Sequence, residues 1–523
     1  MLGALIPTSD NRLYAHGGYA KTDGRYRFFY RPGYDTDCSE AHVTIEALCA
    51  LGYTGLRQGY TPFLDGEQTD LSLVAGTTGD FKDITYDVSV GFGSNKLSYF
   101  LNNTTATDLG VNADGTIQRD FDMGGYEQQE KNLNADFSKS LSDSMNLAFG
   151  LEWRKETFTT QAGEANAYEN NPSGMTSVTP ADAGEFSRNN YAVYADVEQD
   201  INDAVLVQYA LRYEDFSDFG GTLNYKIAGR WSVSDRMTLR GSHSTGFHAP
   251  TPGQANISSI ITTFDGDTGV QIEEGLVPAT SDAAIAAGGV KIKEEEAVSW
   301  SVGLSADIAD STTLTFDLYT TRVDDRIYRT RDISTGADTS ISFYTNALDV
   351  KHQGLDLVIS STFSLGGGIE TLGSLAFNHN SIEVSGQKSI NGITPVSDSL
   401  VEDIENNYPE NRFVINTLTQ LNEQWSLMAR LNYYGEHYDE RGTIGGESGS
   451  AEIDAIVYVD LEIAYAMTDA LTVTLGGSNI FDEYVDEINA PNENRQSVGL
   501  QYPRRTAANY EGGSWYLRGQ YNF

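Results

Sequence analysis

The sequence contains no long apolar run, and this limits how the chain can cross a membrane. No stretch of its 523 residues approaches the roughly 18 consecutive apolar residues that a transmembrane helix needs. A helical membrane protein is therefore excluded. A membrane β-barrel is not excluded, because only about half the residues of its strands are apolar. The mean hydropathy of -0.37 is neutral evidence between these classes.

Basic residues are also scarce. The chain has 34 Lys and Arg against 74 Asp and Glu, which gives a formal net charge of -40. Binding to nucleic acid depends on Lys and Arg that neutralise phosphates, so we predict no nucleic-acid partner. Solvated acidic loops explain the charge better than a dedicated cation site does.

Cysteine is nearly absent, and the two cysteines limit the kinds of site available. Cys38 and Cys49 lie in an irregular stretch without a third cysteine or a histidine at metal-binding spacing, so we predict no zinc or other metal site. A disulfide that closes one long loop is the favoured interpretation, and it implies an oxidising compartment. Two unpaired thiols are the alternative.

The abundant pattern is an alternation of apolar and polar residues with a period of two. In 204–214, Val207 and Tyr209 alternate with Gln208, and 456–465 shows the same pattern. About nineteen such segments occur, many near the ~9–11 residues that a tilted strand needs to span a bilayer. A soluble sandwich also alternates, so the pattern alone does not identify a membrane protein.

The connections between these segments alternate in length. Short turns rich in Asp, Asn, Ser and Gly occur at 142–144, 201–203, 233–236, 308–311, 364–368, 421–424 and 467–470. Long irregular stretches lie between them at 32–69, 104–126, 159–187, 249–291, 384–409, 436–452 and 485–512. Outer-membrane barrels have short turns at one end and long loops at the other. The sequence therefore predicts an all-β fold, a large up-and-down antiparallel transmembrane β-barrel.

Several segments resemble TonB-dependent outer-membrane receptors, in the order in which they occur in that family. The similar segments are 12–33 (RLYAHGGYAKTDGRYRFFYRPG), 84–104, 145–164, 244–256 (STGFHAPTPGQAN), 343–360, 475–484 (LGGSNIFDEY) and 514–523 (SWYLRGQYNF). Each is weak alone, whereas the ordered set over nearly the whole chain is strong. In the family an Arg often stands where His248 stands here.

The resemblance also implies parts that this sequence does not show. Family members begin with a signal peptide, a segment that contacts TonB and a globular plug, none of which precedes residue 12. Their barrels have 22 strands, against about nineteen segments here. We therefore expect residues 1–523 to form one barrel domain that is N-terminally incomplete and carries no plug.

The function that the resemblance implies is TonB-energised uptake of a scarce ligand such as an iron–siderophore complex. Uptake of an oligosaccharide or a cobalamin by the same receptor type, a passive porin-like channel and a surface adhesin are the alternatives. The implied partners are the TonB complex (through a plug outside this chain), outer-membrane lipid and lipopolysaccharide, the barrel assembly machinery and a small-molecule ligand. The implied location is the bacterial outer membrane.

Candidate site residues come from the loop-side ends of strands and from the last segment. The predicted ligand contacts are His248, Gln254, Tyr433, Tyr434, His437 and Tyr438. Trp515, Leu517, Tyr521 and Phe523 alternate and resemble the terminal signal that the assembly machinery reads. Arginines at 329, 331, 441, 504 and 505 lie near loops and are candidates for anionic ligand groups. An aromatic cluster can stack on a planar chelate or a sugar. The alternative for the residues around His437 is the upper aromatic girdle of the barrel, which is the favoured interpretation.

No catalytic motif accompanies these residues. The sequence contains no nucleophile elbow, no phosphate-binding loop and no His-Glu-x-x-His helix. Carboxylates are so abundant that a catalytic pair could be drawn almost anywhere, and such a pair carries no information. We therefore predict that the chain is not an enzyme and uses no cofactor.

Overall fold

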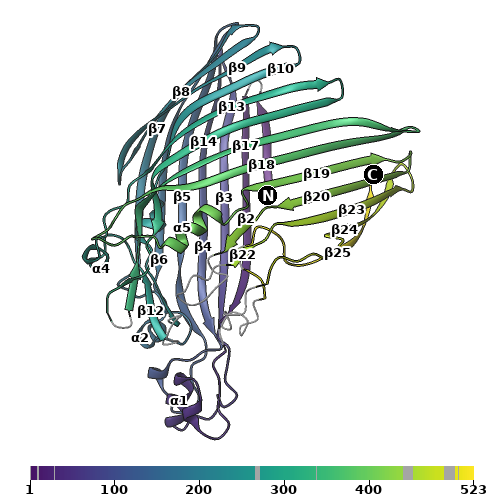
Figure 1. The fold of residues 1–523 in the computed structure, drawn as a ribbon. Helices are drawn as coiled ribbons and strands as arrows, with labels where there is room; N and C mark the ends of the chain where they lie inside the picture. The colour runs from purple at the N-terminus through teal and green to yellow at the C-terminus, as the bar shows by residue number, and fades with distance from the viewer. Residues whose placement is uncertain are drawn as a thin grey trace.

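The computed structural model describes residues 2–8, 11–28, 30–264, 271–336, 339–439, 451–487, 501–503 and 506–522. In this described part, 19 strands form one sheet in which each strand pairs antiparallel with its neighbours in chain order. Figure 1 shows the sheet curling round, with β2–β5 on the far side and β7–β18 toward the viewer. The prediction of a large antiparallel all-β sheet is confirmed.

The strands of this sheet are β1 (Leu2–Thr8), β2 (Asn11–Arg27), β3 (Phe63–Phe81), β4 (Ile84–Asn102), β5 (Phe121–Ser142), β6 (Met145–Gln161), β7 (Gly184–Asn202), β8 (Val205–Phe216), β9 (Gly220–Ser234), β10 (Met237–His248), β13 (Glu295–Ala309), β14 (Thr312–Arg329), β17 (Tyr344–Gly366), β18 (Ile369–Gln387), β19 (Asn411–Gln420), β20 (Trp425–Tyr434), β23 (Ile456–Ala466), β24 (Leu471–Ser478) and β25 (Ser514–Tyr521).

The connections carry the smaller elements. These are η1 (Cys38–Glu40), α1 (Val43–Ala50), η2 (Thr107–Leu109), α2 (Ala165–Asn170), α3 (Pro252–Asn256), β11 (Ser259–Phe264), β12 (Gln271–Leu276), α4 (Asp282–Ala286), β15 (Ile333–Ser334), β16 (Thr339–Ser342), α5 (Asp398–Asn406), β21 (His437–Asp439) and β22 (Ala451–Ile453). Within the described residues, none of the helices is both long and apolar enough to span a bilayer.

The predicted sorting of connections by length is present, with two differences. At the long-loop end, residues 217–219 alone join β8 to β9. The strands also reach further than predicted, since β3 begins at Phe63 and β5 at Phe121. Polar cross-strand contacts continue the pairing there, as when Arg25 Nε lies 2.6 Å from Asp65 Oδ1. Alternation of apolar residues therefore marks only the middle of these strands.

Strand register separates the apolar residues from the polar ones. Leu211 lies opposite Tyr225 on one face of the β8–β9 pair, and the next residues, Arg212 and Asn224, lie opposite each other on the other face. Arg188 lies on the face of β7 that continues the face of Arg212, and it donates to the backbone oxygen of Pro250 at 2.5 Å. The segment 249–258 therefore folds over this face, which is the inner one. Successive side chains of a strand point to opposite faces. The outer wall is consequently apolar and the inner wall polar.

Glycines in the inner wall allow a long side chain to cross one strand and bond to the next. Tyr194 on β7 lies opposite Gly150 on β6, which lies opposite Asp136 on β5. The Tyr194 hydroxyl donates to Asp136 Oδ1 at 2.6 Å. The same arrangement joins Tyr319 to Asn380 across Gly354, Tyr516 to Glu462 across Gly476, and Arg240 to Asp317 across Gly303. Each of these contacts fixes three strands together.

The two ends of the described sheet lie at β1 and β25. Among the described residues, β1 pairs with β2 alone and β25 pairs with β24 alone. Figure 1 marks the two chain ends beside these strands. Both strands therefore present an unpaired backbone edge within the part that the structure describes.

Adding a methyl group at Gly150 should destabilise the barrel more than the same change at Gly93. A Cβ atom at Gly150 would lie 2.5 Å from Tyr194 Cε1 and 2.7 Å from Asp136 Oδ1, whereas a Cβ at Gly93 meets nothing within 4 Å. We expect Gly150→Ala to lower stability by about 1–3 kcal/mol, as overpacking does. The measurement is the temperature at which the compact, SDS-resistant barrel converts to the unfolded band. Equal midpoints for the two variants would show that the crossing contacts contribute nothing.

Candidate ligand-binding site

The loop between β2 and β3 folds into a small unit at the long-loop end (Figure 1). It contains η1 and α1, which the Cys38–Cys49 disulfide joins. Ile45, Leu48 and Leu56 form a buried cluster together with Ile117 from the next long loop. Two loops that are far apart in the sequence therefore share one core.

A third loop completes this unit. Arg31 is buried and its Nε donates to Ser173 Oγ at 2.8 Å, in the loop between β6 and β7. Arg119 places its guanidinium 5.2 Å from the centre of the Tyr60 ring and donates to Thr104 O at 2.7 Å. We call residues 30–62, 103–120 and 162–183 the cap. Because these contacts connect all three loops, the cap is one folded body above the sheet.

His42 is the N-cap residue of α1, which lies inside the cap. Its Nδ1 accepts a hydrogen bond from the Thr44 backbone N–H at 3.4 Å, so the ring caps the helix. Burial, together with the neighbouring Arg31, lowers the pKa of His42 to about 4. The ring is therefore neutral at pH 7 and can accept this hydrogen bond.

The sequence motif at 244–256 covers β10 and α3. His248 ends β10 with an exposed side chain whose Nδ1 lies 3.6 Å from Glu295 Oε1. Gln254 accepts from the Thr251 backbone N–H, while the Thr251 hydroxyl accepts from the Gln254 N–H. This capping box holds Gln254 within the turn. The structure therefore leaves the His248 side chain exposed at the end of β10, whereas the Gln254 side chain is hydrogen-bonded within its own turn.

Arg188 attaches this segment to the inner wall. Its Nη1 donates to Pro250 O at 2.5 Å, and its Nε contacts Glu156 Oε2 at 2.5 Å. The guanidinium also lies 5.0 Å from the centre of the Phe216 ring. Sequence reasoning missed Arg188. Alternation predicts that it faces the inner wall, but its burial depends on Pro250, 62 positions further along the chain.

The aromatic cluster predicted near 433–438 is divided between two faces. Tyr433 stacks on Phe413 with ring centres 4.5 Å apart, on the outer face. Tyr434 faces inward, where the Arg412 guanidinium lies 3.6 Å from its ring centre. Tyr438 is buried. Adjacent residues of one strand necessarily point to opposite faces, so Tyr433 and Tyr434 do not form one surface.

His437 is buried and both its ring nitrogens are engaged. Nε2 accepts from the Ala507 backbone N–H at 3.2 Å, so Nδ1 carries the proton and donates to Gly435 O at 3.0 Å. Burial lowers the pKa of His437, which keeps the ring neutral. The ring face, and not a nitrogen, is what His437 can offer to a ligand.

A cavity at the loop-side end brings several predicted residues together. It has a volume of about 430 Å³, and Tyr433, His437 and Tyr438 line it with Glu402, Glu410, Glu436 and Glu452. Tyr434, His248 and Gln254 lie outside this lining. Within the described residues, no group of three or more His, Cys, Asp or Glu side chains is placed to hold a metal ion. The role of these residues in ligand binding stays a prediction.

The remaining predicted residues lie on β25 or in parts that the structure does not describe. Trp515, Leu517 and Tyr521 are exposed on the outer face of β25. Phe523 lies outside the described residues, as do Arg441, Arg504 and Arg505. Arg329 bonds to Asp332 and Ser342, and Arg331 lies in the loop that follows β14. The assembly role of β25 stays a prediction.

Comparison with known families identifies the fold. A sequence profile described as "TonB dependent receptor-like, beta-barrel" matches residues 3–480. The chain belongs to the TonB-dependent receptor family. This match confirms the resemblance that the sequence motifs indicated. The profile describes the family as receptor-like.

Relatives of this receptor barrel are distant in sequence. The iron-regulated outer membrane virulence protein of Vibrio cholerae is 21% identical over 382 residues, which cover 69% of this chain and 51% of that protein. The chain thus spans about half the length of the curated relatives it matches. It is similar in fold to a ferric enterobactin receptor mutant from Pseudomonas aeruginosa, with a TM-score of 0.61, 14% identity and coverage of 100% of this chain and 77% of that chain. The siderophore receptor PirA from Acinetobacter baumannii gives a TM-score of 0.61 at 13% identity, covering 100% and 76% of the two chains.

Membership in the TonB-dependent receptor family orients the barrel. The protein is an outer-membrane protein, and the long loops of such barrels are extracellular. The cap, α3 and the cavity at Tyr438 therefore all lie at the outside end.

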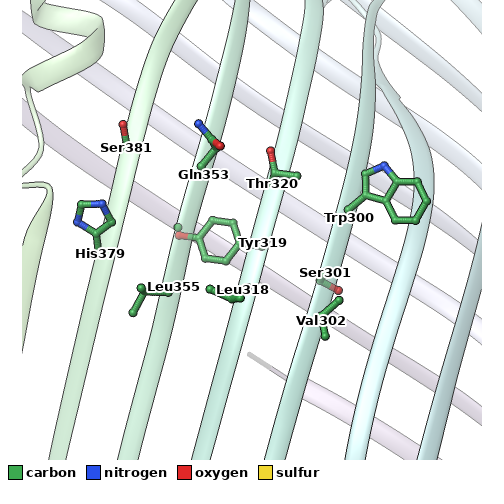
Figure 2. A pocket seen from close by; sticks show the side chains of 11 residues that line it. Trp300, Ser301, Val302, Leu318, Tyr319, Thr320, Gln353, Leu355, His379 and Ser381 are labelled. Atoms are coloured by element: carbon green, nitrogen blue, oxygen red, sulfur yellow. The ribbon is translucent and has the colours of Figure 1, made fainter.

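Two further hollows lie on the wall of the receptor barrel. A groove of about 610 Å³ runs past Trp300, Val302, Leu318 and Leu355 (Figure 2), all on the outer face, where it meets lipid rather than an uptake path. A hollow of about 530 Å³ lies on the inner wall, where Gly18, Ser72, Gly93 and Glu130 are direct partners across four strands. Only the second of these faces the lumen.

Acidification should loosen the cap through His42. Because the folded-state pKa of His42, about 4, lies below the ordinary value of 6.5, the folded cap binds a proton on His42 more weakly than the unfolded chain does. The contribution of the neutral ring to the stability of the cap is complete above pH 6.5 and is lost as the pH falls from about 6.5 to about 4. The protection factors of the α1 amides, which correct for the pH dependence of intrinsic hydrogen exchange, should fall in this window. His42→Asn keeps a capping acceptor but does not titrate, so an equal fall of the protection factors in this variant would contradict the assignment.

Proposed function

We propose that this barrel forms the wall of an outer-membrane receptor that takes up an iron–siderophore complex, with energy supplied by the TonB complex. The observation that carries the proposal is the polar inner wall of a TonB-dependent receptor barrel whose outside end is covered by folded loops. Energised uptake needs a lumen that a polar ligand can enter and a mouth that holds the ligand. The names of the relatives, an iron-regulated outer membrane protein and receptors for siderophores, favour iron as the cargo.

The loops provide the contacts for such a ligand in this proposal. The cap and the α3 segment are both fixed by buried arginines, Arg31 and Arg188, and not by apolar packing alone. The cavity at the loop-side end offers the rings of His437 and Tyr438 to a planar chelate. No catalytic role is assigned to these residues. Loops held in place before a ligand arrives lose less freedom on binding it, which favours affinity.

Two partners belong to the proposal beyond the ligand. The TonB complex would act through a plug of the kind that family members carry ahead of the barrel. The assembly machinery would read β25, whose outer face presents Trp515, Leu517 and Tyr521.

Uptake of iron in the native host tests the proposal. A strain lacking the full gene should lose TonB-dependent accumulation of radioactive iron supplied as ferric siderophores, and the gene in trans should restore it. A passive channel predicts accumulation that persists without TonB and a leak of unrelated small solutes. If the strain instead lost uptake of cobalamin or an oligosaccharide while iron uptake stayed intact, the proposed cargo would be wrong and the proposed receptor function would stand.

Detaching the α3 segment should weaken ligand capture without unfolding the wall. Arg188→Met removes the bond to Pro250 and leaves Glu156 unpaired, which costs about 1.5–3 kcal/mol. We expect affinity for the ferric siderophore to fall by about tenfold or more. Arg518→Met is the matched control, because Arg518 pairs with Glu462 on the inner wall but holds no loop. Equal losses in both variants would contradict a specific role for the α3 segment.

A further inference from the structure

Two lysines face each other on the outer wall of the barrel. Lys131 on β5 and Lys155 on β6 are direct partners in the antiparallel register. Lys131 is exposed and Lys155 is half-buried. Each lies two positions from a residue of the outer apolar face, Leu133 and Trp153, which are also partners of each other. Because residues two apart share a face, both ammonium groups belong to the outer wall.

The nearest outer-face neighbours of this pair contain no carboxylate to balance it. Its outer-face neighbours in the register are Phe92, Gln129, Leu133, Trp153, Thr157 and Asn189. None of these is acidic, and neither lysine forms an ion pair with a described residue, although the chain has 74 Asp and Glu against 34 Lys and Arg. Like charges directly opposite each other in a sheet are unfavourable. The arrangement therefore favours an anion supplied from outside the chain.

The position of the pair along the strands indicates the kind of anion. Toward the short turns, the next outer rows are Leu133 with Trp153, then Ala135 with Leu151, then Phe137 stacked on Phe149 with ring centres 5.2 Å apart. Toward the long loops, the next row is Gln129 with Thr157. The lysines thus lie at the extracellular edge of the apolar band. At this level the acyl chains of the outer leaflet end and its headgroups begin.

We propose that Lys131 and Lys155 bind the phosphate group of an acylated lipid in the outer leaflet, whose chains lie along the rows that begin with Leu133 and Trp153. Two ammonium groups side by side match one phosphate, and the phosphate removes their mutual repulsion. The tryptophan ring meets the lipid where an amphipathic aromatic group is favoured. This site is independent of the uptake proposal, because it lies on the opposite face of the wall from the lumen.

A second pair of cations on the outer wall shows what distinguishes this site. Arg322 on β14 and Lys351 on β17 are also direct partners, and they lie one row beyond the groove of Figure 2. Here Arg322 Nε bonds to Asp324 Oδ1 at 2.7 Å, and Lys351 lies opposite Glu383. The second pair is neutralised by the chain itself. It therefore serves as a matched control with the same geometry and no demand for an external anion.

The test is binding of a bisphosphorylated lipid A to the purified full-length protein in neutral detergent, followed by native mass spectrometry. Lys131→Gln/Lys155→Gln should weaken binding by about tenfold or more, which corresponds to about 1.4 kcal/mol or more. Arg322→Gln/Lys351→Gln should bind as the unmodified protein does. The Lys131→Arg/Lys155→Arg variant should retain binding. An SDS-resistant band of this variant would show that substitution at these positions permits folding.

Three outcomes would overturn the proposal. Equal losses in the Lys131/Lys155 and Arg322/Lys351 variants would show a general effect of surface charge. Unchanged binding in Lys131→Gln/Lys155→Gln would show that the two lysines do not bind the lipid phosphate. Displacement of the lipid by inorganic phosphate at equal concentration would show that the lysines take a free anion and that the apolar rows contribute nothing.

Discussion

The pairing of backbone N–H and C=O groups between neighbouring strands is the constraint on which the rest of this structure depends. Inside a bilayer no water is available to satisfy these groups, so each strand must pair fully with its neighbours. Full pairing fixes the register, and register with a period of two fixes which side chains face lipid and which face the lumen. The direct partners Leu211 and Tyr225, followed by Arg212 and Asn224, show this outcome on one pair of strands.

The inner wall and the loops follow from that constraint. Because the backbone groups of neighbouring strands pair with one another, polar side chains on the inner face bond largely to other side chains, as Tyr194 does to Asp136. Glycines such as Gly150 leave room for a side chain to cross a strand and reach an acceptor on the next. Near the loops, polar side chains of this face hold loop segments in place, as Arg188 holds the α3 segment through its bond to Pro250. A receptor needs both features, a lumen that accepts polar ligands and a mouth with defined loops.

The sequence predicted the parts of the fold that depend on local pattern. Alternation in 204–214 and 456–465 corresponds to β8 and β23, and the short turns lie where tight-turn residues cluster. The sequence did not predict contacts between distant segments. The cap needs Arg31 to meet Ser173, and the burial of His437 needs Ala507, 70 positions away. No periodicity encodes such contacts. The sequence was sufficient to predict that Tyr433 and Tyr434 lie on opposite faces, because the alternation that identified the strand also places adjacent residues on opposite faces.

The most direct test of this account is the environment of consecutive residues on one strand in the assembled membrane protein. Single cysteines placed at positions 193, 194, 195 and 196 of β7 would each carry a fluorescent label, with the Cys38–Cys49 disulfide leaving no other thiol. The account predicts that quenchers attached to lipid chains act on labels at 193 and 195, and that a water-soluble quencher acts on labels at 194 and 196. Quenching that is uniform along the four positions, or reversed between the two faces, would contradict a barrel with an apolar outer wall and a polar lumen.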